Sequence, residues 1–310
     1  VGGRPAQFGR GARGMTAPLR VGGLTIDVLT EIAHRYMPVS FLFNDLPEPD
    51  IARNMSWLGP RFIEPRERTL GLAFQAYVLR AGGLTILVDS CNGEAKHRPT
   101  APWQHDLRAT EFLGNLARLG LCCEDIDIVV CTHLHCDHVG WHTRLRGGRW
   151  VPTFPRARHL FGRREFDHFR ARYDREGAAA VNHGAFADSV LPVVEAGLAE
   201  FVDEDHRLLA DETGEIALVP APGHSLGHCC VRLRAGGTEA IVAGDALHHP
   251  IQLDLPDLPM RADHDPGLAV ATRRSLLAHC ADTGAWLCAG HIPDWSIAQI
   301  RRFEDRFRMG

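Results

Sequence analysis

Short apolar runs alternate with polar segments along most of the chain. Two of these runs, residues 76–79 and 84–88, flank the turn sequence Ala81-Gly82-Gly83, and this arrangement predicts a β-hairpin. The other apolar runs of strand length are residues 126–130, 216–219, 240–242 and 286–288. Because segments of helical length separate several of the runs, the pattern predicts an α/β sandwich.

Four segments have the apolar spacing or the end signals of helices. They are Asp106–Leu119, Arg163–Glu176, Asp265–Ala281 and Asp294–Phe307. In the third segment, an aspartate at the N-cap position precedes a proline in the first turn, which is a typical helix start. Aromatic residues recur every three or four positions in the second segment, and we interpret this stripe as core packing. We expect Arg273, Arg274 and the basic side of the last segment to be exposed.

The segment 38–62 combines apolar residues with four prolines. Proline interrupts the hydrogen bonds of a helix, so the pattern predicts no regular helix here. Three interpretations remain open: a lid or rim over a functional site, a contact in a homodimer, or a loop packed on the sandwich. Within this segment we assign Trp57 to a substrate pocket.

Length and charge limit the classes of protein to consider. The chain has 310 residues, of which 45% are hydrophobic, enough to bury the core of a single large domain, which we place at residues 15–310. Its formal net charge of −4 argues against a nucleic-acid partner, since proteins that bind nucleic acids present basic surfaces.

Targeting signals and cysteine usage predict a cytoplasmic protein. Residues Val1–Gly14 are rich in glycine and arginine, lack the apolar core of a signal peptide, and are expected to be a disordered tail. No apolar stretch reaches the length of a membrane span, so we expect no membrane association. The nine cysteines have no spacing typical of a disulfide framework, which favours a reducing compartment.

The main chemical signal follows the apolar run 126–130. His133, His135, Asp137 and His138 lie within six positions there. Imidazole and carboxylate groups are ligands of Zn²⁺, Mn²⁺, Fe²⁺ and Co²⁺, and a turn that leaves a strand can direct several of them to one point. The first two histidines could bind one ion, and the last two residues could reach a second ion beside it.

Three further donors follow apolar runs downstream. They are His224 in a Pro-Gly-His turn, Asp245 in an Ala-Gly-Asp turn and His291 in an Ala-Gly-His turn. Each donor follows a glycine, which lets the backbone turn tightly and present the side chain. Four strand-end turns that carry metal donors predict a metal site assembled from distant parts of the chain.

In these seven residues and their order, the chain resembles the metallo-β-lactamase superfamily, in its dinuclear hydrolase branch, from about Ala73 to His291. The resemblance implies a four-layer αββα sandwich with a metal site at one edge of the two sheets. It also implies the following ligand sets: His133, His135 and His224 for one ion; Asp137, His138 and His291 for the other; Asp245 as the bridge between them.

The implied chemistry is hydrolysis with two divalent metal ions, for which we expect Zn²⁺, with Mn²⁺, Fe²⁺ or Co²⁺ as alternatives. Two close cations can share a water molecule, lower its pKa to about 7 and so provide hydroxide as the nucleophile. The expected partner is a small-molecule substrate: an ester, a lactone or an organophosphate.

Three further residues near the ligands have supporting or alternative roles in this scheme. Asp89 is either a carboxylate that supports a ligand histidine or an ordinary strand-end aspartate. His228 lies in a segment similar to the family's Gly-His-[Ser/Thr]-x-Gly-His turn, and there it supports the site without binding metal. His248 stands where similar lactonases have a tyrosine; it is either a catalytic or pocket residue or a packed histidine.

The segment Leu247–Met260 follows the candidate bridging residue directly, and its apolar residues alternate with polar residues and prolines. We therefore assign Ile251 and Leu253 to the wall of the substrate pocket. Residues 244–249, which include the candidate bridging residue, are similar to the bridging segment of methyl parathion hydrolase-like enzymes.

Other functions share parts of this pattern. Within the family, a β-lactamase is disfavoured because those enzymes lack an aspartate at the bridging position, and nuclease members usually add basic surface. A mono-iron persulfide dioxygenase, a glyoxalase II-like thioester hydrolase and a metal-binding module without activity remain as alternatives. Metal content and a substrate panel distinguish them.

Overall fold

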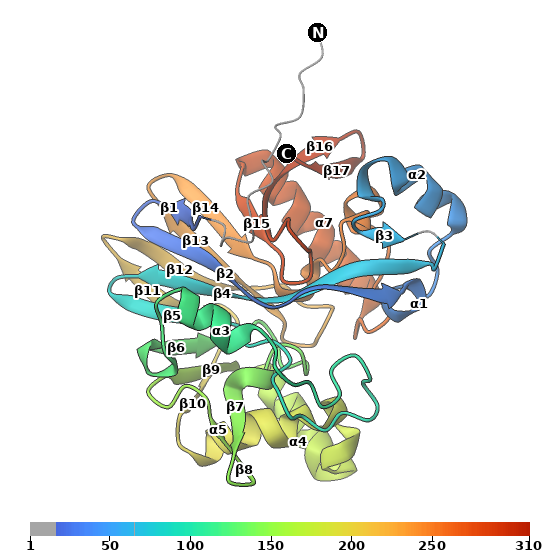
Figure 1. The fold of residues 1–310 in the computed structure, drawn as a ribbon. Helices are drawn as coiled ribbons and strands as arrows, with labels where there is room; N and C mark the ends of the chain where they lie inside the picture. The colour runs from blue at the N-terminus through green and yellow to red at the C-terminus, as the bar shows by residue number, and fades with distance from the viewer. Residues whose placement is uncertain (1–16, 65) are drawn as a thin grey trace.

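The computed structural model describes residues 17–64 and 66–310, so the expectation of a disordered tail at Val1–Gly14 concerns residues outside the described range. Within that range, one sheet has the strand order β1-β2-β4-β5-β6-β9-β10, with β3 paired to β4, and a second sheet runs in order from β11 to β17 (Figure 1). The first sheet consists of β1 (Leu19–Val21), β2 (Leu24–Pro38), β3 (Ile63–Glu64), β4 (Thr69–Ala81), β5 (Leu84–Val88), β6 (Ile128–Val130), β9 (Arg158–Gly162) and β10 (Ala199–Val202). The second sheet consists of β11 (Arg207–Asp211), β12 (Gly214–Pro220), β13 (Cys229–Ala235), β14 (Thr238–Val242), β15 (Trp286–Cys288), β16 (Ile297–Phe303) and β17 (Arg306–Met309).

The helices lie outside the two sheets, and a small hairpin of β7 (Thr143–Arg146) and β8 (Arg149–Pro152) lies beside them (Figure 1). The helices are α1 (Val39–Leu42), α2 (Glu48–Leu58), α3 (Phe112–Arg118), α4 (Arg163–Glu176), α5 (Leu191–Glu195), α6 (Ile251–Asp254) and α7 (Pro266–Thr283). Among the described residues, no helix has both the length and the apolar character needed to cross a bilayer.

The core between the sheets explains why the strands read as apolar runs. Side chains such as Tyr77 and Val130 of the first sheet and Val231 and Val242 of the second sheet belong to one buried cluster. Strands β5, β6, β9 and β10 pair in parallel, and parallel strands are usually covered on both faces. The hairpin of β4 and β5 is confirmed, with Ala81 opposite Leu84.

Helices cover the outer face of each sheet, which gives the expected αββα layers. Phe112 and Leu116 of α3 pack with Leu87 of the first sheet. Leu277 of α7 packs with Ile241 of the second sheet. The mixed α/β fold predicted from the sequence is therefore confirmed.

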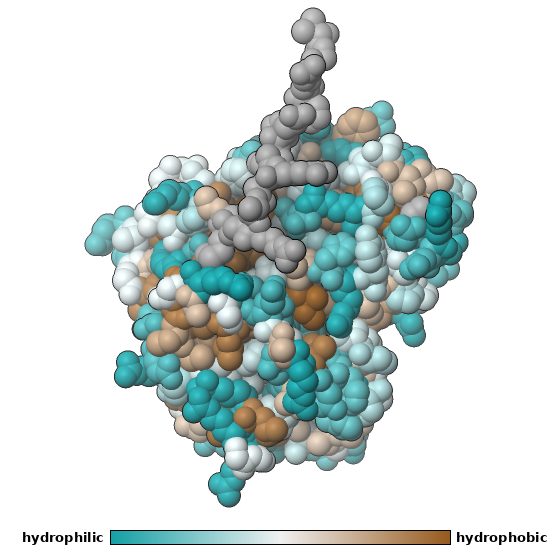
Figure 2. Space-filling model, in the orientation of Figure 1, coloured by the Kyte–Doolittle hydropathy of each residue, from teal (hydrophilic) through white to brown (hydrophobic). Residues whose placement is uncertain are grey.

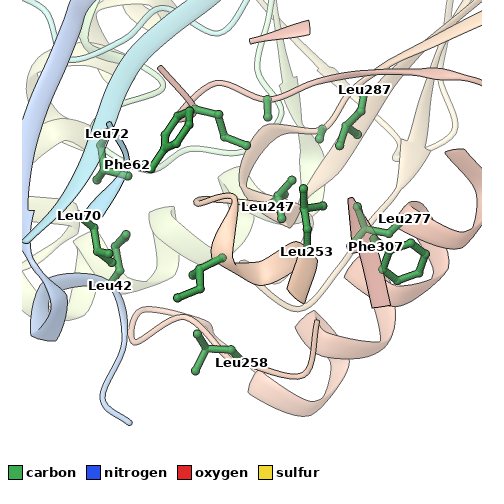
Figure 3. Packing of buried hydrophobic residues seen from close by; sticks show 14 of the residues in the cluster. Leu42, Phe62, Leu70, Leu72, Leu247, Leu253, Leu258, Leu277, Leu287 and Phe307 are labelled. Carbon is green, nitrogen blue, oxygen red and sulfur yellow. The ribbon is translucent and has the colours of Figure 1, made fainter. Parts of the chain in front are cut away.

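The cluster outside the second sheet also includes the segment 38–62 and α6. Figure 3 shows Leu253 beside Leu247 in this cluster, with Leu42, Leu70 and Leu72 gathered at another side of it. All five side chains are buried. The cluster thus ties the N-terminal part of the chain to the residues that follow Asp245.

The structure corrects the expected helix at Asp106–Leu119, because α3 begins only at Phe112. Asp106 and Ala109 have φ angles of 48° and 52°, in the left-handed region, which a right-handed helix excludes. Asp106 instead donates its backbone N–H to the Lys96 carbonyl.

The expected helix at Asp294–Phe307 was also wrong, since this segment forms β16 and the first half of β17. Strand β16 pairs with β15, so hydrogen bonding to the sheet replaces the local helical preference. Glu304, with a φ of 56°, lies in the turn between the two strands.

The segment 38–62 does contain a regular helix, contrary to expectation. Pro47 is the N-cap of α2, and Pro49 lies in the first turn. The N–H groups of a first turn have no partner within the helix, so proline costs no hydrogen bond there. The N-terminal prolines therefore begin this helix instead of breaking it.

Helices α4 and α7 form as predicted, and the Asp265 side chain caps α7 by accepting from the Leu268 N–H at 3.0 Å. The prediction that Arg273 is exposed was wrong. Its buried guanidinium donates to the Ala246 carbonyl at 3.1 Å and to the Leu258 carbonyl at 2.7 Å. Arg274 is exposed as expected and pairs with Asp257.

On the face drawn in Figure 2, hydrophilic residues cover most of the surface, and hydrophobic residues form scattered patches. Among the described residues, the large hydrophobic side chains that are exposed are Tyr36, Leu145, Leu268 and Phe303. Isolated apolar side chains are common on protein surfaces.

Candidate metal centre

The seven predicted ligands come from the loops that follow strands β6, β12, β14 and β15. The structure gathers them into two groups in which the donor atoms lie within 4.8 Å of one another. The first group is His133, His135, His224 and Asp245, and the second is Asp137, His138 and His291. The membership of the two groups agrees with the two ligand sets that the resemblance implied.

Asp245 lies between the groups and presents one oxygen to each. Its Oδ2 lies 3.2 Å from His224 Nε2 and 3.7 Å from His133 Nε2. Its Oδ1 lies 3.1 Å from both His138 Nε2 and His291 Nε2. A carboxylate in this position can bind two cations, one through each oxygen.

Hydrogen bonds to Nδ1 orient three of the histidines. His138 Nδ1 lies 2.9 Å from Asp89 Oδ2, and His224 Nδ1 lies 2.9 Å from Asp263 Oδ1. His291 Nδ1 lies 3.0 Å from the Ala73 carbonyl oxygen. When Nδ1–H donates to these acceptors, Nε2 keeps its lone pair, which is the tautomer that a metal ligand requires.

Unpaired polar atoms indicate what these residues are arranged to bind. Among the described residues, His133 Nε2, His138 Nε2 and Asp245 Oδ1 are buried and have no hydrogen-bond partner. Buried polar groups are normally paired, so three such atoms directed at one another need a further partner. A divalent cation fits this donor set.

The charges at the site also favour a bound cation. Burial lowers the pKa of His133 and of His135 well below the usual value, so both imidazoles are neutral. Burial alone would raise the pKa of Asp245, but His138 and His291 beside it hold that pKa well below its usual range. Burial alone would lower the pKa of His224, yet Asp245 and Asp263 raise it to about 9. The surroundings of Asp245 thus favour positive charge, which bound cations would provide.

Asp89 supports a predicted ligand, His138, which was one of the two interpretations of this residue. Besides facing His138, its carboxylate accepts the Thr132 backbone N–H at 2.8 Å and the Thr132 hydroxyl at 2.9 Å. One side chain therefore holds both a predicted ligand and the start of the loop that carries it.

His228 supports Asp245 from behind. Its Nε2 accepts the Asp245 backbone N–H at 3.0 Å, and its Nδ1 donates to the Ala221 carbonyl at 3.0 Å. Burial lowers the pKa of His228 to about 3, which keeps the ring neutral and able to accept. Gly244 makes this approach possible, because a Cβ there would lie 2.6 Å from His228 Nε2 and its φ is 50°.

His248 lies against the site and not in a separate packed position. Its Nε2 is 3.1 Å from Asp245 Oδ2, and its Nδ1 is buried with no hydrogen-bond partner among the described residues. Burial lowers the pKa of His248, although Asp245 opposes this shift.

A cavity of about 750 Å³ opens at the ligand groups, which is a typical size for a small-molecule site. Asp137, His224, Asp245 and His248 line it, together with Phe41 and Leu42 of α1. The segment 38–62 therefore contributes part of the rim through α1.

The residues that we had assigned to the pocket wall lie elsewhere, and that prediction was wrong. Ile251 and Leu253 are fully buried in the cluster outside the second sheet. Trp57 donates to Asn54 Oδ1 at 2.7 Å and stacks with Arg308, away from the cavity lining. Helix α6 turns Ile251 and Leu253 toward the core, which periodicity alone did not reveal.

Sequence reasoning missed several residues of the site. Asp263 supports His224 but lies in no recognisable motif. Trp103, His183 and Arg261 line the cavity from segments that carry none of the seven predicted ligands. The signal available for Asp263 was only its type, since carboxylates commonly support ligand histidines.

The model of the family described as "Metallo-beta-lactamase superfamily" matches residues 75–291, more than half of the chain. The chain belongs to this superfamily. Its two His/Asp groups each have donors placed so that they could hold a metal ion.

Solved structures share its fold at low sequence identity. The hydrolase AbOPH of the beta lactamase superfamily has a TM-score of 0.76 at 21% identity, over 96% of this chain and 98% of that chain. AidC, described as a dizinc quorum-quenching lactonase in complex with a product, has a TM-score of 0.71 at 20% identity, over 95% of this chain and 96% of that chain. At these identities the likeness concerns the fold.

A curated relative is "Probable metallo-hydrolase Rv2300c" of Mycobacterium tuberculosis, 28% identical over 151 residues. The match covers 48% of this chain and 46% of the relative, so the chain spans about half the length of that protein.

Proposed function

We propose that this superfamily member is a dinuclear hydrolase that holds two divalent metal ions, with zinc as the expected metal. The proposal rests mainly on Asp245, whose two oxygens face two separate groups of histidine and aspartate donors. A protein with one metal site would need only one of these groups. The proposed substrate is a small ester, lactone or organophosphate, and the structural neighbour AidC is a lactonase.

The proposed ligand sets are those implied by the sequence. His133, His135 and His224 would hold one ion, Asp137, His138 and His291 the other, and Asp245 both. When bound, the two ions supply Lewis acidity and an ionised water as the nucleophile. The protein's own part is to fix the donors, which Asp89, Asp263 and His228 do through the hydrogen bonds described above.

His248 is proposed to handle a proton or steady the leaving group. When its Nε2–H donates to Asp245, its Nδ1 carries the lone pair and is the atom that can receive a proton. The wall of Phe41 and Leu42 would exclude water from the bound substrate.

Metal analysis and a substrate panel test the proposal. We expect two zinc or manganese ions per chain and turnover of at least one substrate among aryl esters, lactones and phosphotriesters. One iron per chain with oxygen uptake in the presence of a persulfide would overturn it. Full metal loading without turnover across the panel would also overturn it, and would favour a binding module.

A further inference from the structure

The charged residues that line the cavity are all matched by partners except one. Asp137 and Asp245 belong to the ligand groups. Glu165 accepts the Leu134 backbone N–H at 3.2 Å and the Gly227 backbone N–H at 2.7 Å. Arg172 pairs with Glu176 at 2.9 Å.

Arg261 is the exception. Among the described residues, no carboxylate lies within ion-pair distance of its guanidinium. The acidic residues that follow it in sequence are occupied elsewhere, because Asp263 binds His224 and Asp265 caps α7. The cavity therefore presents one arginine whose charge is not neutralised by a neighbouring side chain.

Backbone contacts hold Arg261 at the cavity rim. Its N–H donates to the Leu42 carbonyl at 2.7 Å, and its Nη1 donates to the Ser40 carbonyl at 3.1 Å. The first bond fixes the backbone and the second fixes one end of the guanidinium against α1, while the rest of this exposed side chain has Nε and Nη2 without a protein acceptor among the described residues. A guanidinium with two free donors on one edge matches a carboxylate in geometry and in charge.

The loop that carries Arg261 also contacts the proposed metal centre. Arg261 therefore lies on the same wall of the cavity as the site where a substrate would react. Asp263 supports His224, and the His264 backbone N–H donates to the His224 carbonyl at 3.0 Å. The loop 260–264 thus runs from the rim at α1 to a proposed metal ligand. Apolar side chains line the cavity along with it, among them Phe41, Phe74 and Trp103.

We propose that the preferred substrate carries a carboxylate at the end remote from the scissile bond, and that Arg261 binds this carboxylate. This inference rests on the proposed hydrolase function and adds the class of substrate. The apolar wall would contact the methylene chain between the two ends, and the guanidinium would determine the choice between acidic and neutral substrates.

A matched pair of esters tests the proposal on the metal-loaded protein. Mono-4-nitrophenyl glutarate and 4-nitrophenyl pentanoate have acyl chains of equal length and differ in the terminal carboxylate. For Arg261→Met we expect a loss of about tenfold or more in kcat/KM for the glutarate, the size expected for losing a charged hydrogen bond. We expect the pentanoate rate to change by less than about twofold, and Arg261→Lys to recover part of the loss, since lysine keeps the charge without the fork.

Arg274→Met is the matched control, because Arg274 is exposed and pairs with Asp257 outside the cavity lining. It should leave the ratio of the two rates unchanged. Equal loss on both esters in Arg261→Met, or no loss on either, would overturn the assignment of Arg261 while the hydrolase function stands.

A binding measurement separates the two proposals. Glutaranilic acid, an amide analogue of the glutarate ester, is titrated calorimetrically into the metal-loaded wild type and Arg261→Met. Weaker binding to the variant supports the carboxylate site even if neither ester is hydrolysed, an outcome that would count against the hydrolase function alone. Equal affinity would overturn the carboxylate site.

Discussion

At the residue scale, the two ring nitrogens of the site histidines have different roles. Each of three histidines uses Nδ1 to bind a protein acceptor and leaves Nε2 for the centre. The acceptors differ in kind: the carboxylates of Asp89 and Asp263 and the backbone carbonyl of Ala73. Carboxylates make a ligand imidazole more basic, so His138 and His224 should bind metal more strongly than His291.

Asp245→Asn should remove most of the metal and at least about a hundredfold of the activity, because an amide has one oxygen and no charge to share between two ions. Metal per chain is measured by elemental analysis, and folding by circular dichroism. Asp257→Asn, which changes an exposed carboxylate, is the control. A variant with near-normal activity would show that the ligand assignment is wrong. We expect His133→Ala to behave in the same way.

His248→Ala should reduce kcat by about ten- to a hundredfold while metal content stays near that of the wild type, since general acid–base groups contribute roughly this much. His279→Ala, on a half-buried histidine that pairs with Glu239 and does not line the cavity, controls for the loss of an imidazole. Unchanged kcat in His248→Ala would leave His248 a packing role only.

The sequence was most informative about residues that act through their chemical type. Seven donors on strand-end turns could be found because four of them lie within six positions and the other three each follow a glycine after an apolar run. Arg261 and Asp263 could not, since arginine and aspartate in a loop are usually solvated, and only the folded chain shows what they contact.

At the element scale, Asp254 connects three pieces of structure. It ends α6, and its buried carboxylate accepts from Asn54 at 3.0 Å and Arg53 at 3.1 Å on α2. It also accepts from Arg306 at 3.2 Å and Arg308 at 2.6 Å on β17. Without it, three arginines would face one another across the junction.

Asp254→Ala should lower the free energy of unfolding by about 3 kcal/mol, because it removes the acceptor from a buried ionic network. Denaturant unfolding measures the change. The effect belongs to the junction of α2, α6 and β17, so metal content should stay near that of the wild type. A change below about 0.5 kcal/mol would mean that the network does not stabilise the fold.

The same network predicts a dependence on pH. Burial alone would raise the pKa of Asp254, but hydrogen bonds from Asn54, Arg308 and Arg53 hold it well below its usual value. A carboxyl with a lowered folded pKa stabilises the protein above its unfolded pKa and loses that contribution as pH falls toward the folded pKa. The difference in unfolding free energy between wild type and Asp254→Asn should therefore be constant above about pH 5 and shrink below about pH 4. A constant difference down to pH 2 would contradict this.

Elements were predicted where local signals and tertiary context agree. Helix α7 has a capping aspartate and a proline in its first turn, and it forms as expected. The segment that became β16 has no alternation of apolar residues, and its strand exists because β15 offers a free edge. Such pairing depends on a partner strand elsewhere in the chain, which periodicity cannot reveal.

At the scale of the whole molecule, the layers were predictable because apolar runs determine strands that are buried on both faces. The cavity was not. Its walls come from α1, α4 and loops far apart in the chain, and their meeting depends on how the layers pack.

Removal of metal should leave the chain folded but less stable. A ligand that binds only the native state stabilises it by about 4 kcal/mol at a thousandfold excess over its Kd. We therefore expect chelation to lower the melting temperature by several degrees and abolish hydrolysis, and added zinc to restore both. Calorimetry and activity measured on one sample test this. A chelated protein with unchanged melting temperature would mean that no ion binds there tightly.

Asp245 faces donors on loops from both sheets, so these donors can meet only in the folded chain. Only His133 to His138 are neighbours in sequence; His224, Asp245 and His291 lie on loops of the other sheet, and we expect them to reach the first group once the sheets have stacked. An unfolded chain can thus offer an ion little more than one short peptide. Uptake of the second ion should be among the last kinetic events of maturation, so a nascent or misassembled copy would stay inactive until its tertiary structure is complete.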